Sequence, residues 1–138
     1  MRGDMSDGII QKRGKAVRWQ IVSLAFALGV YALNNALLIP STASASFGWL
    51  LSSYLNDVMA PVAIFSICNI IYACQGRQLT SLPTMSMTTL VWAFVWEVVG
   101  PMVREQSVAD LFDVVAYIMG TLAYWLLQKH LHASEAIA

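Results

Sequence analysis

The sequence predicts an all-α polytopic membrane protein, a compact four-helix transmembrane bundle with both termini in the cytoplasm. Of its 138 residues, 58% are hydrophobic and only 12% are charged, which is about half the charged fraction of a typical soluble domain. Four apolar stretches are each close to the roughly 20 residues that a helix needs to cross a bilayer. The basic residues are also divided unevenly between the two sides that such a topology creates.

The four apolar stretches predict four antiparallel helices. They cover residues 19–39, 58–74, 82–103 and 108–127. Backbone groups in lipid must form hydrogen bonds within their own segment, and the alternating pattern of a membrane barrel strand is absent from the sequence, so each stretch is interpreted as a helix. The connections cover residues 40–57, 75–81 and 101–107. Short connections make neighbouring helices antiparallel.

The basic residues predict the orientation of the bundle. Five of them precede the first span: Arg2, Lys12, Arg13, Lys15 and Arg18. Arg77 lies in the second connection and Lys129 follows the last span, whereas Arg104 alone falls on the other side. By the positive-inside rule, residues 1–18 and 129–138 are cytoplasmic tails on either side of a transmembrane domain of residues 19–128.

The first apolar stretch has a second interpretation. The basic start, the apolar run and the letters STASAS resemble a secretory signal peptide with a cleavage site at residues 43–45. The apolar part of a signal peptide has about 7–15 residues, whereas residues 19–39 make this run 21 residues long. We therefore favour an uncleaved first helix.

Close contacts between helices are expected at small residues. Ala25 and Gly29 are four residues apart, and so are Ser23 and Ala27. Pairs of small residues at this spacing let helix backbones approach each other in lipid. Either face of the first helix is therefore a candidate for close packing.

Composition and motifs exclude several functional classes. The formal net charge is +0, and no basic stripe with interleaved aromatic residues indicates a nucleic acid partner. Cys68 and Cys74 lack the spacing of a zinc or redox motif, so we expect no metal and no cofactor and interpret both thiols as buried. The sequence contains no Ser/His, Cys/His or HExxH arrangement and no glycine-rich phosphate loop, so nothing in it identifies an enzyme.

Acidic residues are expected to gather at the outer side of the membrane. In the predicted topology this side carries Asn56, Asp57, Glu97, Arg104, Glu105, Asp110 and Asp113. Five of the eight acids in the chain would thus lie together with one cation. Glu97 falls inside its span, where an ionisable residue is costly and points to function, with Arg104 or a bound cation as its partner.

The last predicted helix carries a polar stripe. Asp110, Asp113, Tyr117, Gly120 and Tyr124 follow one another at helical spacing and share one face. This face should point into the bundle, because an Asp at the centre of a membrane helix costs roughly 2.5–3.5 kcal/mol.

We interpret the outer polar residues as a ligand-binding pocket, called the outer pocket. Its predicted members are Glu97, Arg104, Asp110, Asp113, Tyr117, Asn56 and Asp57. Structural explanations stay open: Asp110 could cap the last helix, Tyr117 could be a packing residue, and an Arg104–carboxylate network could only lock two helices together. Asn34 and Asn35 either reach this pocket or form hydrogen bonds across helices.

The outer residues also carry a family resemblance. Glu97, Arg104, Asp110, Asp113 and Gly120 form the pattern E-x6-R-x5-D-x2-D-x6-G. Over residues 90–126, this pattern resembles the VanZ-like family of bacterial membrane proteins, although the chain lacks the histidine that usually follows an early Asp in that family. The resemblance implies a multi-helix fold in the bacterial cytoplasmic membrane, a role in the cell envelope and a link to glycopeptide resistance.

Three functions fit these observations. We favour a small envelope protein whose outer pocket binds a lipid headgroup or a cell-wall precursor, with Arg104 meeting a phosphate or carboxylate. A cation- or proton-handling transporter subunit is the alternative, because acids outnumber cations in the pocket; it would need an oligomer or a larger membrane partner. A scaffold without ligand chemistry is the third, and acid–base chemistry on a lipid-linked substrate would be the enzymatic version of the pocket.

Overall fold

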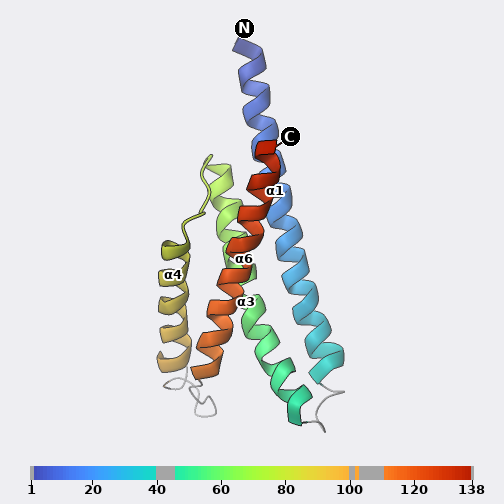
Figure 1. The fold of residues 1–138 in the computed structure, drawn as a ribbon, viewed down its shortest axis with the longest axis vertical. Helices are drawn as coiled ribbons and strands as arrows, with labels where there is room; N and C mark the ends of the chain where they lie inside the picture. Colours follow the sequence, from blue (N-terminus) through green and yellow to red (C-terminus); the bar gives the residue numbers. More distant parts are fainter. Residues whose placement is uncertain (1, 40–45, 100–101, 103–110, 138) are drawn as a thin grey trace.

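The structure is a computed structural model that describes residues 2–39, 46–99, 102 and 111–137 (Figure 1). Every regular element in these residues is a helix, which confirms the predicted all-α class. Helix α1 (Arg2–Leu33) runs directly into the π-helical segment η1 (Asn34–Leu38), and α4 (Leu82–Phe94) runs into a second π-helical segment, η2 (Val95–Val99). The other two helices are α3 (Ser46–Cys74) and α6 (Leu111–Ile137).

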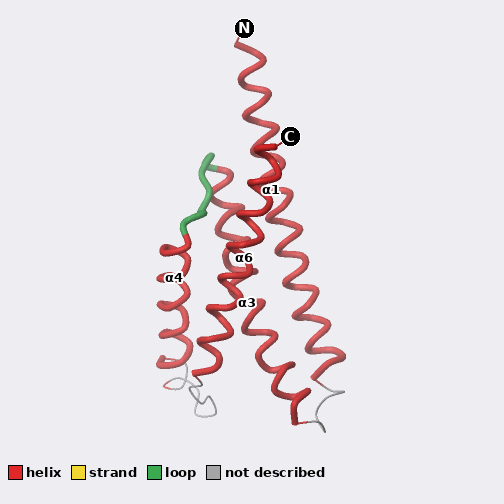
Figure 2. Tube along the Cα trace, viewed as in Figure 1, coloured by secondary structure: helices red, strands yellow, loops and turns green. Residues whose placement is uncertain are grey.

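The helices alternate in direction, so that both termini lie at the same end of the molecule (Figures 1 and 2). Three segments are long and apolar enough to cross a membrane: Arg13–Leu38, Ser52–Cys74 and Leu111–Leu131. Large apolar side chains such as Phe26, Phe94 and Leu126 are more than half exposed. Apolar surface on this scale marks contact with lipid or with another protein. The chain is therefore a multi-pass membrane protein.

Several helices are longer than the sequence predicts. The predicted connection at residues 40–57 is wrong in its second half, because α3 begins at Ser46. This early part of α3 is held against η1, where the backbone oxygen of Ser52 accepts a 2.6 Å hydrogen bond from Asn34 Nδ2. At the other end of the chain α6 continues to Ile137, since residues 128–137 are rich in good helix formers. The predicted connection at residues 75–81 is confirmed.

Helix α3 is the centre of the molecule. Helix α1 packs along one side of α3 and α6 along another, whereas α4 packs mainly against α6 and lies at the edge of the molecule (Figure 1). Of the two small-residue faces of α1, Ser23 and Ala27 are buried, and Ala25 and Gly29 are exposed. Cys74 is exposed and Cys68 is only partly buried, which corrects the expectation that both thiols are buried.

Tyr124 joins three of these elements inside the apolar core, next to Phe65. Its hydroxyl donates to Gln20 Oε1 of α1 at 2.6 Å and lies 3.0 Å from the Phe65 carbonyl oxygen of α3. The same hydroxyl accepts hydrogen bonds from Asn69 Nδ2 of α3 at 2.9 Å and from Gln128 Nε2 of α6 at 3.0 Å. We call Tyr124, Gln20, Asn69 and Gln128 the Tyr124 cluster.

The Tyr124 cluster also positions the turn between α3 and α4. Asn69 Oδ1 accepts a 2.6 Å hydrogen bond from the Leu79 backbone N–H, and Asn69 Nδ2 donates to the Leu79 carbonyl oxygen at 3.2 Å. The Asn69 side chain therefore satisfies both backbone groups of Leu79, which have no helical hydrogen-bond partner in the turn. In lipid this is important because no water is present to form these hydrogen bonds.

Gly120 sets the distance between α6 and α3. A side-chain carbon at this position would collide with the backbone carbonyl of Val58. Gly120 is buried and lies on the same face of α6 as Tyr117 and Tyr124. The stripe predicted for this helix therefore faces the bundle interior over its described part.

We expect Gly120→Ala to destabilise the bundle by about 1–3 kcal/mol, the usual cost of overpacking, because the Val58 backbone must move. Gly29→Ala is the matched control, since nothing lies within 4 Å of that position and alanine is the better helix former. The free energy of unfolding in mixed micelles, obtained by denaturing-detergent titration, measures both. Equal stability of the two variants would contradict the close contact.

Tyr124→Phe removes only the hydroxyl and should lower the free energy of unfolding by about 1–2 kcal/mol, the range for interhelical hydrogen bonds in membranes. Tyr72→Phe is the control, because Tyr72 is 40% exposed. The same titration compares them, and an unchanged Tyr124→Phe protein would show that the Tyr124 cluster adds no net stability.

Candidate functional site

The candidate site lies at the end of the bundle opposite the termini. Four predicted members of the outer pocket meet there: Asp57 of α3, Glu97 of η2, and Asp113 and Tyr117 of α6. We call these four residues the acidic cluster. All four are partly buried, so the acids are neither solvated loop residues nor fully enclosed.

Asp57 is the member that connects the others. Its carboxylate accepts a hydrogen bond from the Tyr117 hydroxyl and lies within hydrogen-bonding reach of the Asp113 carboxyl group. The charge of Glu97 acts on both Asp57 and Tyr117. Side chains from three separate elements thus converge on one place, as the sequence predicted from topology.

Local sequence explains why they meet. Asp113 and Tyr117 are four residues apart and so lie on one face of α6. The contact between Gly120 and the Val58 backbone draws that face against α3 immediately beside Asp57. Pro61, inside α3, has no N–H to donate to the Asp57 carbonyl oxygen four residues earlier. The Asp57 carbonyl oxygen therefore lacks this helical hydrogen bond.

The electrostatics of the acidic cluster favour a ligand that brings positive charge or hydrogen-bond donors. Carboxylates as close as Asp57 and Asp113 repel each other unless a proton or a cation lies between them. Within the described residues, no group of three or more His, Cys, Asp or Glu side chains is arranged to hold a metal ion. An ammonium, hydroxyl or guanidinium group suits this set of acceptors.

A set of asparagines adjoins the acidic cluster. Asn34 Nδ2 donates to Asn56 Oδ1 at 2.9 Å as well as to Ser52, so Asn34 forms hydrogen bonds across helices. Asn35 also approaches Asn56, at 3.4 Å. Asn34 is fully buried, and its Oδ1 has no hydrogen-bond partner. Such an unsatisfied buried acceptor is rare in native structures.

Both π-helical segments occur at this end, and each carries polar residues of the site. Segment η1 contains Asn34 and Asn35, and η2 contains Glu97. A π-helical turn widens the helix and is frequent at functional sites. Here the two segments lie where polar side chains must reach across the bundle.

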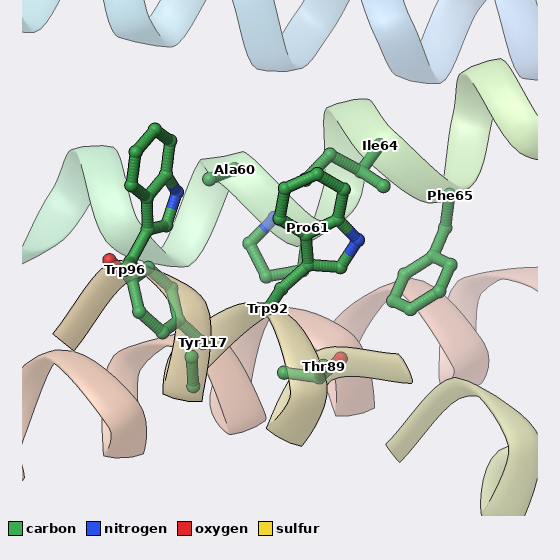
Figure 3. A pocket seen from close by; sticks show the side chains of 9 residues that line it. Ala60, Pro61, Ile64, Phe65, Thr89, Trp92, Trp96 and Tyr117 are labelled. Carbon is green, nitrogen blue, oxygen red and sulfur yellow. The ribbon is translucent and has the colours of Figure 1, made fainter. Parts of the chain in front are cut away.

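An aromatic cleft opens beside Tyr117, between α3 and α4 (Figure 3). Its lining includes Ala60, Pro61 and Ile64 of α3, Trp92 of α4, Trp96 of η2 and Tyr117 of α6. Trp92 and Trp96 extend from the α4 side toward α3 (Figure 3) and are 46% and 57% exposed. The space inside the cleft is about 30 Å³, the volume of about one water.

Two predicted members of the outer pocket, Arg104 and Asp110, lie outside the described residues. Glu105, the predicted connection at residues 101–107 except Met102, and the alternative cleavage site at residues 43–45 lie outside them as well. The partnership between Glu97 and Arg104 therefore stays a prediction. Glu97 and Asp113 each have further interacting groups.

Sequence reasoning missed the cleft and the Tyr124 cluster. Trp92 and Trp96 look like ordinary interfacial aromatics in the sequence, and their role in a cleft depends on the gap between α3 and α4. The sequence did contain a signal for Gln20, Asn69 and Gln128, because an amide side chain within an apolar stretch must find a hydrogen-bond partner in lipid.

Comparison with protein-family models, with curated proteins and with solved structures gave no match. The fold and the site therefore define the class: a multi-pass helical membrane protein with an acidic cluster beside an aromatic cleft.

A double-mutant cycle between Asp57→Ala and Tyr117→Phe should give a coupling energy of about 0.6–1.7 kcal/mol, as for interhelical hydrogen bonds in membranes. Asp57→Ala with Tyr72→Phe is the control pair and should be additive. The free energy of unfolding in micelles provides all the values. A coupling of zero for the first pair would contradict the hydrogen bond between α3 and α6.

Proposed function

We propose that the protein binds the headgroup of a membrane lipid or a lipid-linked cell-wall precursor at its outer end. The meeting of Asp57, Glu97, Asp113 and Tyr117 beside a cleft lined by aromatic and apolar side chains carries this proposal. Polar acceptors at the end of an apolar cleft match an amphiphile, which has a polar head and a chain. Tyr117 belongs to both the acidic cluster and the cleft, so the two would be occupied by one ligand.

The roles of the polar groups follow from their charges. Asp57, Asp113 and Glu97 would accept hydrogen bonds from an ammonium or hydroxyl group, and Arg104 would meet the phosphate of the same ligand. A phosphoethanolamine headgroup carries both kinds of group. Charge-assisted hydrogen bonds of this type are roughly twice as strong as neutral ones.

The membrane setting belongs to the same proposal. Residues 82–103 would form a fourth span, with the acidic cluster outside and both termini in the cytoplasm. The basic residues support this orientation: Arg13 and Arg18 precede the first predicted span, Arg77 lies in the turn between α3 and α4, and Lys129 follows the last predicted span. The motif from Glu97 to Gly120, through its resemblance to VanZ-like proteins, supports a place in the bacterial cytoplasmic membrane and a link to glycopeptide resistance.

A cation- or proton-handling subunit is the second candidate. The proximity of Asp57 and Asp113 favours it, because two adjacent carboxyl groups can share a proton or a cation. In this case the ligand would be the ion itself, and the cleft would have no part in binding.

We expect Arg104→Ala to weaken binding of phosphatidylethanolamine or polyprenyl phosphate about tenfold or more, since a hydrogen bond to a charged group contributes about 1.5–3 kcal/mol. Asp57→Asn should weaken binding of phosphatidylethanolamine but not of polyprenyl phosphate, which has no ammonium group. Native mass spectrometry of the purified full chain with each lipid measures both effects. Arg18→Ala, at the opposite end, is the control.

Unchanged binding of both lipids by folded Arg104→Ala protein would sink the headgroup proposal. Cation flux into liposomes that Asp57→Asn abolishes would instead favour the second candidate. If every variant of the acidic cluster lost only stability, with no change in lipid binding or cation flux, the cluster would have a purely structural role.

A further inference from the structure

Two arginines line a second cleft at the opposite end of the molecule from the acidic cluster. Arg13 of α1 and Arg77 of the turn after α3 share this arginine cleft with Ala16, Ala73, Gly76 and Gln78. Its volume is about 280 Å³, far larger than that of the aromatic cleft. Both arginines are exposed.

The turn after α3 is built to hold Arg13 nearby. Gly76 ends the helix with a φ of 72°, in the left-handed region that favours glycine. The backbone N–H groups of Gly76 and Arg77 donate to the Ala73 and Tyr72 carbonyl oxygens at 3.0 and 2.9 Å. A side-chain carbon at Gly76 would lie 2.6 Å from Arg13 Nη2. Glycine therefore shapes the turn and also leaves room for the guanidinium.

The charges in this cleft are not balanced. Among the residues that the structure describes, neither guanidinium is paired with a carboxylate. The carbonyl end of α3 attracts one cation, but this weak dipole does not neutralise two. An anion between the arginines would remove their mutual repulsion. The planar guanidinium donates paired hydrogen bonds that match the oxygens of a phosphate.

The depth of the cleft points to the source of that phosphate. Two candidate membrane segments end beside it, Arg13–Leu38 at Arg13 and Ser52–Cys74 at Cys74. The cleft thus lies where the hydrocarbon core gives way to lipid headgroups. It also lies at the end with most of the basic residues, the side that faces the anionic leaflet under the positive-inside rule.

From these observations we propose that Arg13 and Arg77 bind the phosphate of an anionic phospholipid in the leaflet on the side of the termini. The site is independent of the acidic cluster, which lies at the other end and attracts positive charge. A lipid held here would tie α1 to the turn after α3 and leave the acidic cluster untouched.

The test compares two double variants of the full chain with equal loss of charge. Arg13→Gln with Arg77→Gln should weaken binding of phosphatidylglycerol about tenfold or more, as expected for lost charge-assisted contacts. Lys15→Gln with Arg18→Gln should change it less than about twofold, because neither residue lines the cleft. Native mass spectrometry in detergent measures the binding of phosphatidylglycerol relative to that of phosphatidylcholine, the reference lipid, for each variant.

Gly76→Ala tests geometry at constant charge. It should displace the Arg13 guanidinium and weaken binding of phosphatidylglycerol although every charged residue remains. Thermal unfolding confirms that each variant is folded, and Arg77→Gln alone replaces the double variant if that one fails to fold. An equal loss of phosphatidylglycerol binding in the two double variants would overturn the proposal, because it would show nonspecific electrostatic attraction between the basic end and anionic lipid. Full competition by soluble glycerol phosphate would overturn the assignment to a lipid.

Discussion

The hydroxyl of Tyr124 is the interaction on which the arrangement of the helices depends. In lipid, apolar side chains gain little by touching one another instead of acyl chains, so packing and interhelical hydrogen bonds must supply specificity. This hydroxyl collects partners from Gln20, Asn69 and Gln128, and Asn69 extends the network to the turn before α4. One hydroxyl thus connects α1, α3 and α6, and in lipid no water is present to replace its partners.

The close approach of α6 to α3 turns this arrangement into a site. Gly120 brings the α6 stripe against the Val58 backbone, and the neighbouring residue Asp57 then meets Asp113 and Tyr117. Helix α4 packs mainly on α6, and the aromatic cleft lies between α3 and α4. The acidic cluster and the aromatic cleft therefore both result from the way α6 packs against α3 and α4.

The two ends of the bundle have opposite electrostatic character. The acidic cluster favours cationic or donating groups, whereas the arginine cleft favours phosphate. The sequence already indicates this division, because in the predicted topology five of the eight acids fall on the outer side and seven of the eight Lys and Arg residues fall on the side of the termini. At the outer end, partly buried acids from three elements face one another. At the other end, Arg13 of α1 and Arg77 of the turn after α3 line one cleft.

Sequence alone determined the membrane class and the interior face of α6, because composition, apolar run length and helical spacing are local properties. It also grouped Asp57, Glu97 and Asp113 at one end, since alternating spans leave no other place for them. It did not locate the start of α3 at Ser46, nor the hydrogen bond that joins this part of α3 to Asn34. Nor could it predict the Tyr124 cluster, the aromatic cleft or the arginine cleft. Each of these depends on which helix faces which neighbour, and in lipid that choice is made by small residues and single hydrogen bonds, not by the apolar pattern.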